Sequence, residues 1–130
     1  MDTEELRESI ARFVGFTTGT IEYHDPMSGR EFEGSDFSIP YWIAPTKERY
    51  KYSPPDFPSN FNACLEWVLP ELNKRGVYLI VSQYFEDESF GVVLVGTGPY
   101  GKDFKARGLS LSLAFCEAVG KYLVSVGVEV

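Results

Sequence analysis

Residue types that commonly build active sites are scarce in this chain of 130 residues. It contains one histidine, His24, and two cysteines, Cys64 and Cys116. Ser-His-Asp, Cys-His and multi-histidine metal sites would all depend on His24, which lies beside a turn-forming segment. No apolar run approaches the ~20 residues that a membrane-spanning helix needs. The sequence therefore disfavours a histidine-dependent enzyme and an integral membrane protein.

Positive charge is also in the minority. The chain has 12 Lys and Arg against 19 Asp and Glu, a net charge of −7, which disfavours general nucleic-acid binding. The charge is uneven: residues 1–40 carry nine acids and three bases, whereas residues 47–51 and 102–107 each carry three bases and one acid. These two basic segments are either solvated loops or parts of a pocket for a small anion.

The length falls in the usual range of one domain, so we expect residues 1–130 to share a single core. The N-terminus is acidic and helix-like, without the basic and apolar regions of a signal peptide, and this favours a cytoplasmic protein. Cys64 and Cys116 each lie on an apolar helical segment. In a reducing compartment we expect both to be buried free thiols rather than a disulfide.

The clearest pattern is an α-β-β-α block in the second half of the chain. Apolar stripes predict helices over residues 61–74 and 110–124, and the runs between them predict strands over 77–84 and 89–95. Both strands are apolar on much of both faces, which is typical of strands covered on both sides. We predict an α+β fold: an αβα sandwich in which an antiparallel sheet of four to five strands is flanked by three helices.

The first half of the chain predicts one helix and a hairpin. Apolar spacing indicates a helix over residues 3–14, with Asp2 and Glu5 suited to a capping box. Strands over 17–23 and 30–37 flank a cluster of turn-forming residues, which would join them as a hairpin.

Prolines interrupt the middle of the chain. Residues 38–59 form an insertion rich in proline and aromatic residues, so we expect irregular backbone there apart from a short strand near 41–43. Ser59 or Asn60 can cap the following helix. Pro70 is expected to kink that helix or to end it in a 3₁₀ turn.

A glycine-rich basic loop is expected over residues 96–108. Its start, Gly-Thr-Gly-Pro-Tyr-Gly-Lys-Asp, matches two phosphate-loop patterns incompletely: the next predicted helix does not follow at once, and Asp103 stands where a magnesium-binding hydroxyl belongs. The segment is therefore either a plain surface loop or a loop whose backbone amides, cations and aromatic rings bind an anion.

A second basic and aromatic segment, within 38–59, offers the same chemistry, although its aromatic rings could instead cover the sheet or meet another subunit. The ligand-binding residues predicted from both segments are Trp42, Lys47, Arg49, Tyr50, Gly96, Thr97, Gly98, Tyr100, Gly101, Lys102, Lys105 and Arg107. The carboxylates at Glu31 and Glu33, and those at residues 86–88, do not have the spacing of a calcium loop. We expect no metal and no cofactor.

Three stretches resemble a known family, the phage ABA-sandwich domain: Phe-Val-Gly-Phe at 13–16, Pro-Asp-Phe-Pro-Ser-Asn-Phe-Asn-Ala at 55–63 and Leu-Ser-Leu-Ala-Phe-Cys-Glu-Ala at 111–118. The resemblance implies an αβα sandwich in a phage or prophage protein, and hence a location in the host cytoplasm. It supplies no established catalytic residues.

Three classes of function follow. The first is a non-catalytic phage accessory protein that binds a small anionic, nucleotide-derived ligand and so withholds a signal of bacterial immunity from the host. The second is a protein-protein inhibitor of a host enzyme, and the third is a small phosphate or nucleotide hydrolase with a carboxylate-metal site. We also expect a homodimer or a higher homo-oligomer, because small αβα proteins with exposed aromatic residues often complete a site by pairing.

Overall fold

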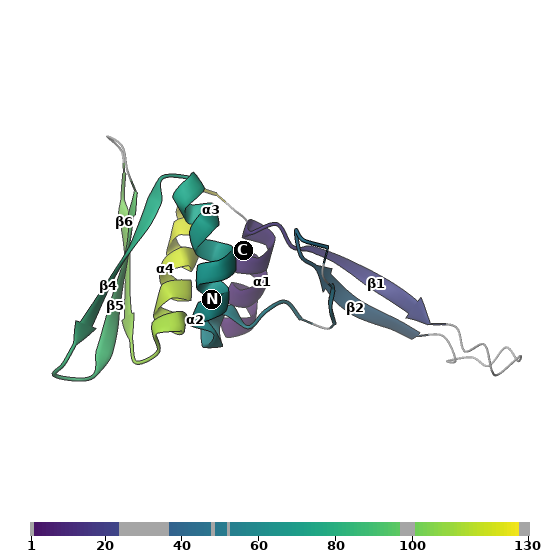
Figure 1. Ribbon diagram of the computed structural model, residues 1–130, viewed down its shortest axis with the longest axis horizontal. Helices are drawn as coiled ribbons and strands as arrows, with labels where there is room; N and C mark the ends of the chain where they lie inside the picture. Colours follow the sequence, from purple (N-terminus) through teal and green to yellow (C-terminus); the bar gives the residue numbers. More distant parts are fainter. Residues whose placement is uncertain (1, 24–36, 48, 52, 97–100, 128–130) are drawn as a thin grey trace, which may run out of the picture.

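The computed structural model describes residues 2–23, 37–47, 49–51, 53–96 and 101–127. It has a sheet packed on a layer of helices, and a second sheet extends away from them (Figure 1). A three-stranded sheet forms one end of the molecule, helices form the middle, and a second three-stranded sheet points away on the opposite side.

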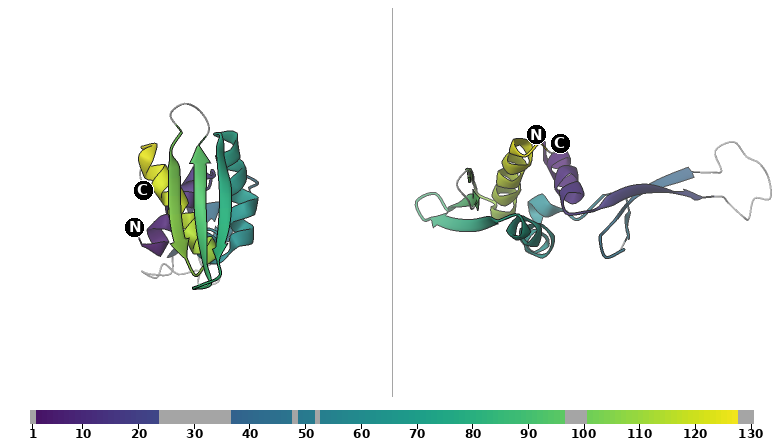
Figure 2. Two further views of the ribbon diagram at one scale, coloured as in Figure 1. Left: turned by 90° about the vertical axis from the view of Figure 1, so that its left-hand side faces the viewer. Right: turned by 90° about the horizontal axis from the view of Figure 1, so that it is seen from above.

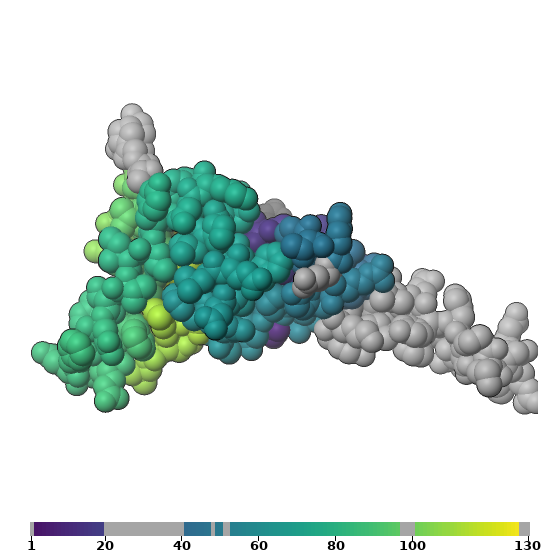
Figure 3. Space-filling model, viewed as in Figure 1, coloured from purple at the N-terminus to yellow at the C-terminus, as the bar shows by residue number. Residues whose placement is uncertain are grey.

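The first of these sheets is an antiparallel meander of β4 (Val77–Tyr84), β5 (Ser89–Gly96) and β6 (Asp103–Gly108), with β5 in the centre. Its register pairs Leu79 with Leu94 and Leu94 with Phe104. One face packs on α4 (Leu111–Ser125), and Figure 2 shows that no helix lies over the other face. In Figure 3 the β4–β5 hairpin stands out from the body beyond the helices.

The core lies between this sheet and the helices. Leu94 of β5 and Phe115 of α4 are fully buried in it, together with Leu72 of the helix that precedes β4. Ser110 begins α4, because its hydroxyl accepts the Leu113 N–H. The predicted helix over 110–124 is confirmed within one residue at each end.

α1 (Thr3–Phe13) packs against α4 in the helical layer. The Asp2 carboxylate accepts the Glu5 N–H at 2.8 Å, which confirms the Asp2 half of the predicted capping box. Gly15 adopts φ +100° just after the helix, a left-handed conformation that glycine reaches without steric cost.

The predicted helix over 61–74 is one rod in three parts, preceded by the 3₁₀ turn η1 (Phe57–Ser59). Asn60 caps α2 (Phe61–Ala63), a π-helical turn, η2 (Cys64–Val68), follows, and α3 (Leu69–Lys74) completes it. In the widened turn the Leu69 N–H donates to the Cys64 carbonyl, five residues back. Pro70 has no N–H to donate and stands at the start of α3, directly after the widened turn, so the break in the ordinary helical bonding falls next to the residue that cannot contribute a bond. The predicted 3₁₀ ending at Pro70 is wrong, because the helix continues to Lys74 and the irregular turn is a π turn that ends just before the proline.

The second sheet contains β1 (Thr17–Tyr23), β2 (Phe37–Ile43) and β3 (Arg49–Lys51), with β2 in the centre. β1 is confirmed as predicted. Its partner is not the strand predicted over 30–37, because β2 begins at Phe37 and runs to Ile43. The short strand predicted near 41–43 is confirmed as the end of β2, whereas residues 38–40 are strand where irregular backbone was expected. Residues 24–36, which include His24, Glu31 and Glu33, lie outside the described residues.

The α+β class is confirmed, but a single sheet of four to five strands covered on both faces is not. The described strands form two sheets of three. β6 lies where a loop was predicted, and β4 is an edge strand with one face uncovered. Its apolar residues, which are typical of a central strand, are therefore largely exposed.

Candidate functional site

The side chains on the uncovered face of the β4–β6 sheet follow from the strand register. Val92 and Leu94 are buried beneath α4, so the alternate residues of β5 point to the other side, here called the outer face. By pairing, the outer face carries Tyr78, Ile80, Ser82, Tyr84, Ser89, Gly91, Val93, Val95, Asp103, Lys105 and Arg107.

Arg107 is the best-anchored cation of this face. Its guanidinium carbon lies 3.7 Å from the centroid of the Tyr84 ring, a close cation–π contact. Its Nε donates to the Ser89 hydroxyl at 2.9 Å, and its Nη2 donates to Asp87 Oδ2 at 2.9 Å. These two bonds leave other guanidinium N–H groups for a ligand.

Gly91 makes this stack possible. A Cβ at Gly91 would lie 2.8 Å from the Tyr84 ring, closer than side-chain contacts allow. The ring therefore lies directly on the backbone of β5, with Arg107 against it. Glycine at this position is explained by the close approach of the ring.

Asp87 holds Arg107 from the β4–β5 turn. Its carboxylate accepts the hydroxyl of Ser89 at 2.6 Å and the backbone N–H of the same residue at 3.2 Å. These bonds to Ser89, followed by the attraction of Arg107, lower the pKa of Asp87 below its ordinary value, and both favour the ionised form. The Asp87–Arg107 pair therefore stays charged near neutral pH.

A shallow depression of about 330 Å³ opens beside this stack, and we call it the β6 depression. Three cations line it, because Lys105 and Arg107 of β6 are joined there by Lys121 of α4. The Lys121 Nζ donates to the Lys105 carbonyl at 2.6 Å, which holds its charge at the β6 edge. None of the described residues that line the depression is acidic, and the others are Ser82, Tyr84, Gly91, Val92, Val93 and Ala106.

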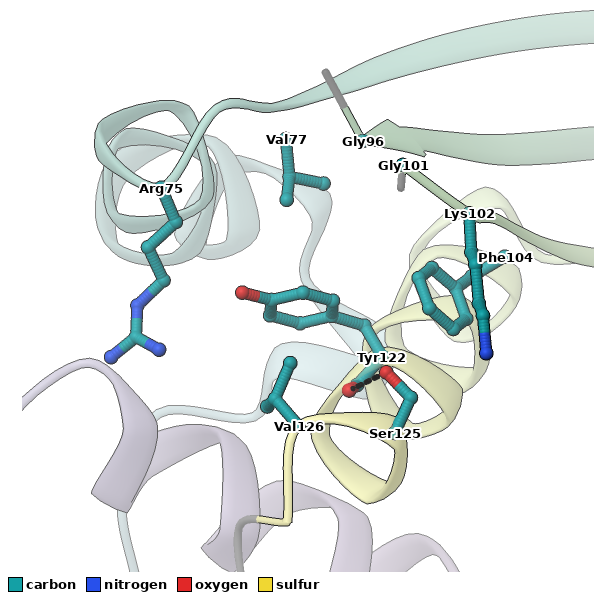
Figure 4. A pocket seen from close by; sticks show the side chains of 9 residues that line it. All are labelled: Arg75, Val77, Gly96, Gly101, Lys102, Phe104, Tyr122, Ser125 and Val126. Carbon is teal, nitrogen blue, oxygen red and sulfur yellow. Dashed lines mark hydrogen bonds between the residues drawn. The ribbon is translucent and has the colours of Figure 1, made fainter. Parts of the chain in front are cut away.

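A second hollow, of about 310 Å³, lies at the other end of the sheet and is called the end pocket (Figure 4). Val77, Phe104, Tyr122 and Val126 give it apolar walls. Arg75 and Lys102 line it from opposite sides in Figure 4, and the Arg75 guanidinium lies 4.8 Å from the centroid of the Phe13 ring. The C-terminal ends of α3 and α4 are near, and their partial negative charge weakens any attraction for an anion there.

The structure divides the residues predicted for the glycine-rich loop between these two places. Gly96, Gly101 and Lys102 line the end pocket, whereas Lys105 and Arg107 line the β6 depression. Thr97, Gly98 and Tyr100 lie outside the described residues. The division has a simple cause: residues 103–108 form a strand, which carries Lys105 and Arg107 away from the loop.

The residues predicted from the 38–59 insertion are in neither place. Trp42 is buried in the core, with the Arg12 guanidinium 5.4 Å from its ring, so it is not an exposed stacking platform. Tyr50 is half-buried against Phe16. The other two are exposed near β3: Lys47 in a turn with φ +76°, and Arg49 with its guanidinium 5.5 Å from the Tyr41 ring.

Sequence reasoning missed Tyr84 and Lys121 of the β6 depression and Arg75 of the end pocket. One signal was available for part of the depression: Lys105 and Arg107 are two residues apart, the spacing that places both on one face of a strand. Lys121 lies on a helix, and no local pattern connects it to β6.

In the part of the chain that the structure describes, no group of three or more His, Cys, Asp or Glu residues could hold a metal ion. The described helices include none that is long and apolar enough to cross a membrane. Fold and site together define an α+β protein with a basic depression on an open sheet. Protein-family models, curated proteins and solved structures were each compared with the chain, and none matches it.

Proposed function

We propose that this protein binds a small anionic ligand in the β6 depression. The observation that carries the proposal is the convergence of Lys105, Arg107 and Lys121 on one hollow without a lining acid, in a chain of net charge −7. Arg107 is paired with Asp87, so Lys105 and Lys121 supply most of the positive charge of this surface. Such a surface attracts phosphate or carboxylate groups through charge-assisted hydrogen bonds.

The volume and the lining of the β6 depression restrict the size and the chemical class of the ligand. A hollow of about 330 Å³ is at the small end of ligand pockets, so it suits a phosphate with one or two attached rings. The Tyr84 ring lies between Gly91 and Arg107, which leaves the guanidinium plane as the surface on which a base could stack. A nucleotide-like ligand is compatible with both features.

The resemblance to the phage family adds a finer prediction. In that setting the ligand would be a nucleotide-derived signal of bacterial immunity, and the protein would withhold it in the host cytoplasm without chemical turnover. This prediction rests on the resemblance together with the anion chemistry of the β6 depression.

Calorimetric titration and thermal melting test the proposal, with inorganic phosphate, mononucleotides, cyclic dinucleotides and ADP-ribose as ligands. A ligand at one hundred times its Kd stabilises the native state by about 2.7 kcal/mol. We expect the Lys105→Ala, Lys121→Ala double variant to bind at least about tenfold more weakly, because each charge-assisted hydrogen bond contributes about 1.5 kcal/mol or more.

The matched control is the Lys74→Ala, Lys102→Ala double variant, which removes the same charge outside the β6 depression. We expect it to bind like the wild type. A loss of binding in this control alone would place the ligand in the end pocket and contradict the proposal. A flat response of the wild type to every ligand would contradict it as well.

A second candidate, a protein-protein inhibitor, is favoured by the β1–β2 ribbon, which extends from the side of the molecule opposite the β4–β6 sheet (Figure 1). The Lys105→Ala, Lys121→Ala double variant distinguishes the two candidate functions. Loss of Lys105 and Lys121 would weaken ligand binding but leave inhibition of a host enzyme through the ribbon unchanged.

A further inference from the structure

β4 is an open sheet edge. It pairs with β5 along its whole length, from Val77 opposite Gly96 to Tyr84 opposite Ser89, and no described strand pairs with its other side. The unpaired N–H and C=O groups of an edge strand can accept another extended chain. Natural proteins usually protect such an edge with charges, proline or a bulge.

None of these protections is present in β4 itself. Residues 77–84 read Val-Tyr-Leu-Ile-Val-Ser-Gln-Tyr and include no charged residue, proline or glycine. Five of the nine large hydrophobic side chains that are exposed among the described residues lie in or next to this strand: Tyr78, Ile80, Val81, Tyr84 and Phe85. Ile80 is on the outer face and Val81 on the inner face, so a strand added beside β4 would cover apolar surface on both faces.

The opposite edge of the same sheet is protected. β6 carries Asp103, Lys105 and Arg107, and the Lys105 carbonyl already accepts a hydrogen bond from the Lys121 ammonium. An incoming strand would have to displace that bond and bury charges. The sheet can therefore be extended through β4 and is blocked at β6.

We infer that two copies of this chain join antiparallel through β4 and form one sheet of six strands. An uncharged strand meets its own copy without repulsion between like charges. The β4–β4 pair also uses the open edge of both copies, so the assembly closes as a two-fold dimer instead of growing into a fibre. This interface requires no ligand and is tested separately from the function proposed above, although Tyr84 belongs both to β4 and to the lining of the β6 depression.

The register follows from the faces of the strand. A two-fold axis perpendicular to the sheet keeps each outer face on the outside, so a residue must pair with one of the same face. Centring the pair on 78–84, where every residue except the half-buried Leu79 is exposed, places Val81 opposite its own copy. Tyr78 then lies beside Tyr84 of the second copy.

Sedimentation equilibrium over a range of concentrations tests the interface. We expect the wild type to reach twice the 14.7 kDa mass of one chain, and the Ile80→Lys variant to remain at the single-chain mass. The matched control is Val124→Lys, on the exposed face of α4, which should dimerise like the wild type. Circular dichroism checks that Ile80→Lys, a change at a half-exposed side chain, keeps the fold.

Cross-linking tests the register. Opposed residues of an antiparallel pair are close enough for a disulfide, so Val81→Cys should form a covalent dimer on mild oxidation, whereas Val124→Cys should not. Cys64 and Cys116 are fully buried and do not compete. A wild type that stays monomeric at every concentration would overturn the inference, as would an Ile80→Lys variant that dimerises like the wild type. A dimer whose Val81→Cys variant does not cross-link would overturn the register.

Discussion

Alkaline pH should unfold this protein partly through one thiol, that of Cys116. Cys64 and Cys116 are fully buried on facing helices, with 3.8 Å between their sulfur atoms. The Cys64 thiol donates to the Phe57 carbonyl at 3.2 Å, so its sulfur is left to accept the Cys116 hydrogen. This bond to Cys64, followed by the loss of solvation on burial, raises the pKa of Cys116 far above its ordinary value.

The magnitude follows from proton linkage. In the unfolded chain a thiol titrates near 8.5, whereas the folded Cys116 keeps its proton. Below that pH both states are protonated and stability is unaffected. Above it the unfolded state binds fewer protons, so the free energy of unfolding falls by about 1.4 kcal/mol per pH unit, a loss of about 2 kcal/mol at pH 10.

Urea denaturation under reducing conditions at pH 7, 8.5 and 10 measures this loss. The Cys116→Ser variant is the control, because its hydroxyl does not titrate while every tyrosine and lysine of the chain is kept. We expect the wild type to lose about 2 kcal/mol more than the variant between pH 7 and pH 10. Equal losses in the two proteins would refute the reasoning, because they would show that Cys116 ionises without unfolding.

Two further substitutions test local features of the fold and site. Asn60→Ala removes the side-chain acceptor of the Ala63 N–H and should lower the free energy of unfolding by about 1 kcal/mol in urea, whereas the exposed Asn62→Ala should change it little. Gly91→Ala should force the Tyr84 ring off β5 and weaken anion binding measured by calorimetry. The melting temperature should change little, because the ring is at the free end of an exposed side chain. Undiminished binding would show that the Tyr84–Arg107 stack is not part of the site.

Local signals were sufficient for most helices and for the β4–β5 hairpin. Helix caps are contacts within four residues, so Asp2, Asn60 and Ser110 mark the starts of their helices independently of tertiary packing. The buried free thiols were predicted for a similar reason, since both cysteines lie in apolar helical stripes. The kind of irregularity at Pro70 was not predictable, because several backbone arrangements can accommodate the missing N–H.

β6 and the division of the site needed the tertiary structure. The sequence Asp-Phe-Lys-Ala-Arg-Gly has weak strand character, and its pairing with β5, Phe104 beside Leu94, supplies the stabilisation that local propensity does not. That pairing also separates Lys102 from Lys105. Trp42 illustrates the same limit, since nothing in its neighbours along the chain distinguishes a buried indole from an exposed one.

The amino-acid sequence alone determined where the main helices and the central hairpin lie, because caps, turns and apolar periodicity act over a few residues. The tertiary structure decided which edge of the sheet is open and which cations meet. β4 has the composition of a covered central strand, yet it is an exposed edge of its sheet, since no described strand pairs with its free side. Its composition alone did not indicate this position. Lys121 and Lys105 are 16 residues apart in the sequence, and they come into contact only because α4 packs on the sheet.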